Sequence, residues 1–229
     1  MPWFFDLFGS AVGKKAVMAL SGIVLFGFVL VHMLGNLKLY LPVTGDHVPI
    51  NEYGHFLRHV GEPLVPAYTV LWSARLVLLL AVGLHLWSAW AVTRLARQAR
   101  PVAYRRAEVV QATYASRTMR WGGVIILLFV LYHLAHFTWG WVHPSFIPGD
   151  VRHNMIAGFG VWWVSAFYVV AQVALGFHLN HGLWSLFQSL GWNHPRYNAW
   201  RRGFARVFAW VVTLGNVSFP VAVLAGLVR

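Results

Sequence analysis

The chain has 229 residues, of which 59% are hydrophobic and 10% charged, and its mean hydropathy is +0.60. A soluble domain carries about 25% charged residues, so the composition excludes a soluble domain. It predicts a single all-α integral membrane domain over residues 1–229. Because cysteine is absent, disulfides, thiolate-held iron–sulfur clusters and covalently attached haem are also excluded.

Five apolar runs are long enough to cross a bilayer as helices. Helix-breaking prolines delimit them: Pro42 follows the first run, Pro66 precedes the second and Pro144 follows the third. The first residues do not form a basic region ahead of a short apolar one, so no cleavable signal peptide is expected. The predicted transmembrane helices cover residues about 15–40, 65–97, 119–142, 155–190 and 203–228.

A polar segment separates the first two predicted helices. Its stretch INEYGHFLRHV, residues 50–60, predicts a short interfacial helix that carries His55 and His59 one turn apart. Tryptophans at the ends of other runs suit the interfacial belts of a membrane protein. These are Trp139, Trp141, Trp192 and Trp200.

The formal charge of +12 is explained by topology, and no nucleic-acid partner is expected because no motif for one is present. One side of the predicted bundle carries Lys14, Lys15, Arg94, Arg97, Arg100, Arg105, Arg106, Arg117, Arg120, Arg196, Arg201, Arg202 and Arg206. The other side carries Lys38, Arg58, Arg152 and Arg229. The positive-inside rule therefore predicts a cytoplasmic N-terminus. The expected location of this multi-pass protein is the bacterial cytoplasmic (inner) membrane.

Four histidines, one in each of the first four predicted spans, are the chemical feature of the chain. An imidazole in hydrocarbon is costly unless it is hydrogen-bonded or ligates something. Consecutive spans alternate in direction and each histidine lies in the later half of its span. His32 and His133 should therefore meet near the outer face, and His85 and His178 near the cytoplasmic face. Two bis-histidine b haems, bound without covalent attachment, would satisfy all four side chains.

Spacing leaves two ligand positions open. His136 follows His133 by three residues and His181 follows His178 by three, so either member of each pair could reach a macrocycle. Gly182, four residues after His178, would let a flat ring approach that helix. Other functions also stay open: a cytochrome b of hydrogenase or formate dehydrogenase type, a histidine-dependent transporter, or an anchor without haem.

The chain resembles the cytochrome b subunit of succinate dehydrogenase and fumarate reductase, of the single-chain, two-haem b558 type, over nearly its whole length. The resemblance rests on LVHMLGNL, INEYGHFL, ARLVLLLAVGLHLW, LLFVLYHLAHFTWG and ALGFHLNHGLWSLFQSLGWN. The last motif is the most specific, with His178 and Gly182 matching the haem-ligand segment. The resemblance favours His178 over His181 and His133 over His136, and it implies the same pairing as the depth argument.

The resemblance also implies partners and a reaction. It implies a flavoprotein subunit and an iron–sulfur subunit docked on the cytoplasmic side, with this chain passing electrons through two haems to a quinone, expected to be menaquinone, in the tricarboxylic acid cycle. Succinate oxidation itself would belong to the flavoprotein, and its direction, succinate oxidation or fumarate reduction, stays open. Some dihaem relatives carry a glutamate for proton movement where this chain has Gly176, so that proton pathway is not expected.

Quinone carbonyls need hydrogen-bond donors, and reduction needs protons. Near the outer haem the predicted contacts to quinone or propionate are Asn36, Glu52, Tyr53, His55 and His136. Near the inner face they are Lys15, Ser21 and Trp184, with His181 and Gly182 beside the inner haem. Glu52 is as well explained as an ordinary solvated carboxylate of the loop.

Overall fold

The computed structural model describes residues 9–99 and 114–229, except for the side chains of residues 114–118. Its regular elements are helices, apart from an isolated bridge between Thr44 and His47. They are α2 (Ala11–Asn36), η1 (Leu37–Tyr40), α3 (Pro49–His59), α4 (Thr69–Gln98), α5 (Tyr114–His133), η2 (Leu134–Thr138), α6 (Val151–Phe159), α7 (Trp162–Ser189), η3 (Pro195–Tyr197) and α8 (Asn198–Leu224).

Five helices of the described residues are long and apolar enough to cross a membrane. They are Ala11–Tyr40, Thr69–Gln98, Met119–Thr138, Trp162–Ser189 and Pro195–Leu224. Large apolar side chains cover their outer surfaces, including Leu79 at 70% exposure and Trp121 at 76%, as expected where lipid replaces water. The predicted all-α fold with five membrane-spanning helices is confirmed.

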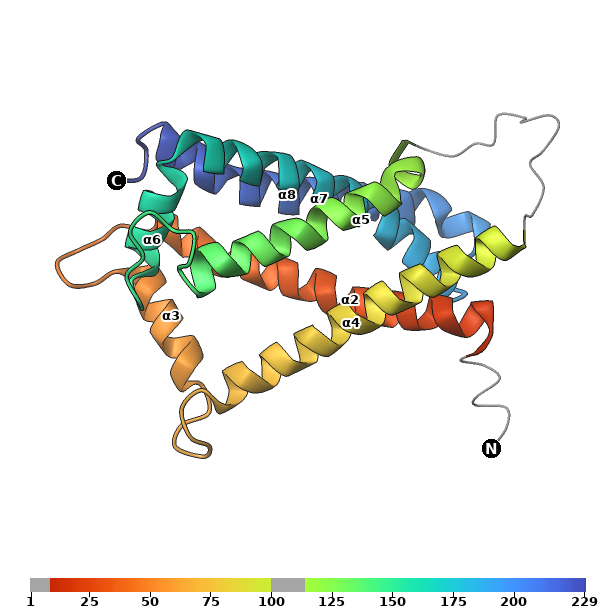
Figure 1. Cartoon of the computed structure of the whole chain (residues 1–229), viewed down its shortest axis with the longest axis horizontal. Helices are drawn as coiled ribbons and strands as arrows, with labels where there is room; N and C mark the ends of the chain where they lie inside the picture. The colour runs from red at the N-terminus through yellow and green to blue at the C-terminus, as the bar shows by residue number, and fades with distance from the viewer. Residues whose placement is uncertain (1–8, 100–113) are drawn as a thin grey trace.

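The long helices form two groups. In one, α2 packs along α4, and in the other, α7 packs along both α5 and α8 (Figure 1). The groups meet where α2 contacts α7 and α8. The short helices α3 and α6 lie together with the C-terminus at one end of the bundle, on the left of Figure 1.

The short helix predicted over residues 50–60 is confirmed as α3 (Pro49–His59). Pro49 stands at its start, where a missing backbone N–H costs nothing. Tyr53 of α3 packs on Gly35 of α2, and a β-carbon at Gly35 would lie 2.6 Å from the Tyr53 ring. Glycine in α2 therefore allows the close approach that seats α3 on the bundle.

The predicted continuous helix over residues 155–190 is wrong, because two helices cover it. α6 ends at Phe159, the chain turns through Gly160 and Val161, and α7 begins at Trp162. The Ser165 hydroxyl donates to the Phe159 carbonyl at 2.6 Å and satisfies one acceptor that the break releases. The break allows α6 to lie across the end of the bundle.

The third predicted helix, 119–142, ends four residues earlier than expected. After His133 the helix widens into the π turn η2, closed by the bond from Trp139 N to Leu134 O at 3.0 Å. The chain then leaves at Gly140, whose φ of +73° favours glycine. The π turn changes the direction of side chains beyond His133, which separates His133 from His136.

The cations gather as the sequence predicts. Lys14, Arg94, Arg97 and Arg120 lie at the end of the bundle opposite α3 and α6, together with the α7–α8 connection and its arginines (Figure 1). Arg100, Arg105 and Arg106 lie outside the described residues, as does the side chain of Arg117.

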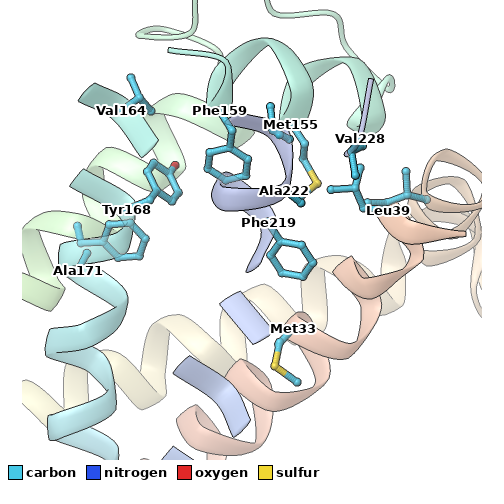
Figure 2. Packing of buried hydrophobic residues seen from close by; sticks show 13 residues of the cluster. Met33, Leu39, Met155, Phe159, Val164, Tyr168, Ala171, Phe219, Ala222 and Val228 are labelled. Carbon is cyan, nitrogen blue, oxygen red and sulfur yellow. The ribbon is translucent and has the colours of Figure 1, made fainter. Parts of the chain in front are cut away.

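The larger apolar core lies at the α3–α6 end. Figure 2 shows Met33 of α2, Phe159 of α6, Tyr168 of α7 and Phe219 of α8 turned toward the same interior. A second, smaller core joins α7 to α8 through Leu179, Ala209 and Val212, with Phe26 and other side chains of α2 packed against it. The packed ends hold the helices at fixed positions around the four intramembrane histidines.

Candidate functional site

The four intramembrane histidines meet in two pairs. The ring centroids of His32 on α2 and His133 on α5 are 5.9 Å apart, and the rings are at 83°. Those of His85 on α4 and His178 on α7 are 6.2 Å apart, at 60°. The structure therefore brings together the same partners that the depth argument pairs.

The separation within each pair suits a shared metal. An imidazole nitrogen lies about 2 Å from a metal that it ligates, and the ring centroid lies a little beyond that nitrogen. Two imidazoles on opposite sides of one iron therefore have centroids about 6 Å apart. Both observed separations agree with this value.

The pairs lie at two levels of the bundle. His85 contacts Ser21 and Met18 of α2, whereas His32 follows Ser21 on α2 by eleven residues. At the rise of an α-helix this separates the pairs by about 16 Å. On α7, Tyr168 contacts His133 and His178 comes ten residues later, which gives a similar spacing. The arrangement is two histidine pairs stacked along the helix bundle.

The inner pair, His85 and His178, has the surroundings of a ligand pair. Nδ1 of His85 donates to the Met18 carbonyl at 3.1 Å, and the Ser21 hydroxyl lies 3.3 Å from the same nitrogen. A bond of this kind fixes the tautomer and leaves Nε2 available as a ligand. Nδ1 of His178 is buried and has no hydrogen-bond partner among the described residues. Neither imidazole is tied up in a helix-to-helix bond with its counterpart.

Glycines give the inner pair room. A β-carbon at Gly22 would lie 3.5 Å from the His85 ring, in ordinary contact, and one at Gly182 would meet no described atom within 4 Å. Gly182 thus leaves space beside α7 one turn after His178. His181 is half-buried, and its ring is not paired with His85 as the His178 ring is.

The outer pair, His32 and His133, has different contacts. His32 stacks on Phe28, with centroids 5.3 Å apart, and its Nε2 has a long contact of 3.4 Å with the Asn36 amide nitrogen. Asn36, predicted as a quinone contact, therefore lies against a haem-ligand candidate. Nδ1 of His133 lies 3.3 Å from the Tyr168 hydroxyl, so its Nε2 is left for a ligand bond.

His136 turns away from the outer pair. It is fully buried, its ring lies 4.8 Å from the His143 ring, and a β-carbon at Gly158 would lie 2.8 Å from it. Its Nδ1 is 3.0 Å from the Tyr168 hydroxyl, while Nε2 has no partner among the described residues. The contacts place His136 between α5 and α6, so it is not a competitor of His133 for the position facing His32.

Two outer-face candidates, Glu52 and Tyr53, line a surface cavity of about 830 Å³ beside α3. Lys38 and His47 line it too, and neither is predicted from the sequence. A hydrogen bond of 2.5 Å joins Nδ1 of His47 to a Glu52 carboxylate oxygen, and the Lys38 ammonium lies 5.4 Å from the Tyr53 ring centre. The signal available in the sequence was a lysine and a histidine flanking the segment that holds Glu52. His55 is not in the lining and stacks on His59 at 4.0 Å.

The inner-face candidates do not form one pocket. Ser21 is buried beside His85, Lys15 is exposed, and Trp184 lies under the Arg202 guanidinium at 4.7 Å. The cavity of about 680 Å³ at this end is lined by other residues, among them Trp192, Trp200 and Arg201.

Arg201 differs from the other basic residues that the structure describes, because it is only 3% exposed. Its Nη2 donates to Asn193 Oδ1 at 3.1 Å, to the His194 carbonyl at 3.0 Å and to Asn198 Oδ1. It therefore fastens the α7–α8 connection as well as adding to the positive end of the bundle.

The residues present fit haem. Histidine is the donor expected for low-spin b haems, and the paired rings have the required separation. A non-covalent group is the one consistent with a chain that contains no cysteine.

A comparison with protein families matches residues 94–217 to the succinate dehydrogenase/fumarate reductase transmembrane subunit. The match covers more than half of the chain. The chain belongs to this family. It is therefore a multi-pass membrane subunit of a succinate:quinone oxidoreductase complex, in a family that associates with the catalytic subunits and commonly binds haem b.

The matched residues include His133 and His178, whereas His32 and His85 lie before them. No curated protein and no solved structure matches the chain. The link between the two halves of the site therefore comes from the contacts in the structure.

Proposed function

We propose that this member of the succinate dehydrogenase/fumarate reductase transmembrane family is a single-chain, dihaem anchor of the b558 type. His85 and His178 would hold the inner haem, and His32 and His133 the outer haem. Electrons would pass between the iron–sulfur subunit and a quinone, expected to be menaquinone. The observation that carries the proposal is the meeting of four histidines in two pairs, with centroids 6.2 and 5.9 Å apart.

Haem supplies reversible one-electron chemistry when it is bound. The residues of this chain do the rest: the Met18 carbonyl orients His85, the Ser21 hydroxyl lies beside the same nitrogen, and apolar helices keep water away. With two histidines assigned to each haem, no position for substrate would be left at the metal. The contribution of the chain is therefore to place two carriers in line and to set their potentials.

The cavity beside α3 supports a quinone site near the outer haem. Lys38 follows His32 by six residues, about 9 Å along the helix. Its ammonium would donate to a quinone carbonyl, and Glu52, paired with His47, would exchange protons with the outer side. Glu52→Gln should lower quinone turnover in the assembled complex and leave the haem spectrum unchanged; equal turnover would remove Glu52 from the proposal.

Haem content of the purified chain tests the function. We expect two b haems per chain by reduced-minus-oxidised spectroscopy with an iron determination. His85→Ala should halve the haem content, because it removes one ligand of the inner pair and leaves the outer pair in place. His181→Ala is the matched control and should keep both haems.

A chain without Soret absorbance would refute the proposal and leave an anchor or a transporter. Equal haem loss in His85→Ala and His181→Ala would refute the ligand assignment alone. Loss of both haems in His85→Ala, with the fold intact by circular dichroism, would mean that the two centres are not independent.

A further inference from the structure

Tyr168 of α7 stands between His133, the last residue of α5, and His136 of η2. Its hydroxyl lies 3.3 Å from Nδ1 of His133 and 3.0 Å from Nδ1 of His136. The side chain is 4% exposed, and its ring makes edge contacts with Phe129 and Phe159 at centroid distances of 5.0 Å each. Packing therefore fixes the ring (Figure 2), and the hydroxyl has little freedom to choose other partners.

Proton positions follow from the number of donors. A neutral histidine that binds a metal through Nε2 carries its proton on Nδ1, so His133 donates to the Tyr168 oxygen. Tyr168 has a single O–H, which it then donates to Nδ1 of His136. His133 thus donates to Tyr168, and Tyr168 donates to His136. Both hydrogen bonds have a fixed donor and a fixed acceptor.

We propose that Tyr168 is the positioning residue of the outer haem centre. It fixes the ring orientation and tautomer of His133 and increases the electron donation of that imidazole to the iron, while His136 holds the tyrosine hydroxyl in its acceptor role. The inference rests on the proposed function and goes beyond it, because it assigns to an apolar-looking span a hydrogen-bonding residue that sets the potential of one of the two haems.

The neighbouring Tyr132 provides a matched control. It belongs to the same aromatic cluster, with its ring 6.2 Å from that of Tyr168 and 5.5 Å from that of His136. Its hydroxyl is buried and has no hydrogen-bond partner among the described residues. Removing either hydroxyl leaves a phenyl ring of the same shape, but only one of the two hydroxyls contacts a histidine nitrogen.

The test is a redox titration of the purified complex carrying Tyr168→Phe or Tyr132→Phe. In Tyr168→Phe the midpoint potential of one haem should become more positive, because its ligand loses a hydrogen-bond acceptor and donates less to ferric iron. The low-spin electron paramagnetic resonance signal of that haem should shift as well. The other haem should be unchanged, and Tyr132→Phe should leave both haems as in the wild type.

His136→Leu is a second variant that keeps the His133–Tyr168 contact. It removes the acceptor of the tyrosine O–H, so a smaller shift in the same direction is expected. Tyr168→Phe could lose the outer haem altogether while Tyr132→Phe retains two haems. The difference in haem content between the two variants would then support the positioning role.

Equal potentials in Tyr168→Phe and the wild type would overturn the inference, as would equal shifts in Tyr168→Phe and Tyr132→Phe. A wild-type complex without haem would instead overturn the proposed function. The two failures are therefore distinguishable in one set of preparations.

Discussion

Asp150 connects α3 to α6 through one carboxylate oxygen. Its Oδ1 accepts from the Asn51 side chain and from the His153 backbone N–H, both at 2.9 Å. The second bond caps the start of α6. Burial raises the pKa of Asp150, but the hydrogen bonds from His153 and Asn51, with the charges of His153 and Arg152, lower it overall. The ionised form is thus the one that the fold prefers.

Asp150→Ala should therefore destabilise the protein at neutral pH by about 0.5–2 kcal/mol, the usual cost of a lost helix cap. A depressed folded pKa contributes stability above the unfolded value of about 3.9, and this stability is lost as the pH falls through the folded pKa. Thermal unfolding in detergent should show a gap between wild type and variant at pH 7. The gap should narrow below about pH 4, and a constant gap across this range would contradict the electrostatic origin.

At this scale the sequence was informative about the histidines. Depth along each span predicted which imidazoles meet, because span order and helix direction alone determine it. Tyr168 gave no comparable signal, since a tyrosine in an apolar run is ordinary and its two partners come from another helix. Lys38 is not predicted because only the folding of η1 against α3 places it beside Glu52. His47 lies in the loop before α3, and the structure is needed to show that it turns toward Glu52.

Among the elements, α7 and α8 approach closely at Gly176. A β-carbon built there would overlap the Thr213 hydroxyl of α8. Small residues permit such approaches between membrane helices. The same contact explains why a glutamate cannot take this position here, because the space that its side chain needs is filled by Thr213.

Gly176→Ala should destabilise the α7–α8 pair by about 1–3 kcal/mol, the usual cost of overpacking. Combining it with Thr213→Ala should recover most of the loss, since the second change removes the atom that the new methyl group meets. Melting temperatures of the two single variants and the double variant, in the same detergent, measure this coupling. Additive losses would show that the contact is not the cause.

The sequence predicts the existence of the helices better than the residues at which they begin and end. The long helices follow from apolar length and flanking prolines, and α3 follows from its position and pattern. The break between α6 and α7 has no proline to signal it, and it depends on Ser165 reaching back to Phe159. The π turn after His133 has no sequence signature either, although it decides which face His136 occupies.

At the scale of the whole molecule, most of the described basic residues collect at the end opposite α3 and α6. On the positive-inside rule we expect that end to lie in the cytoplasm, where the catalytic subunits would dock. The absence of cysteine from the sequence makes this orientation easy to test.

Asp46→Cys lies in the exposed segment before α3, and Arg196→Cys lies in the exposed α7–α8 connection. In intact spheroplasts a membrane-impermeant maleimide should label the first variant, and it should label the second only after permeabilisation. The unsubstituted chain should take up no label. The opposite pattern would invert the topology and exchange the inner and outer centres.

Each histidine pair takes one ring from the α2–α4 hairpin and one from the α5–α7–α8 group. Among the described residues α4 packs along α2 and is not closely packed on α7, so the His85–His178 pair joins α4 to the later part of the chain. On the dihaem proposal each haem would then link the N-terminal helices, which are synthesised first, to the C-terminal helices, which are synthesised last. A cell short of iron or porphyrin would accumulate membrane-inserted subunit whose two helix groups are not linked. Assembly of the complex would then be limited by the supply of haem.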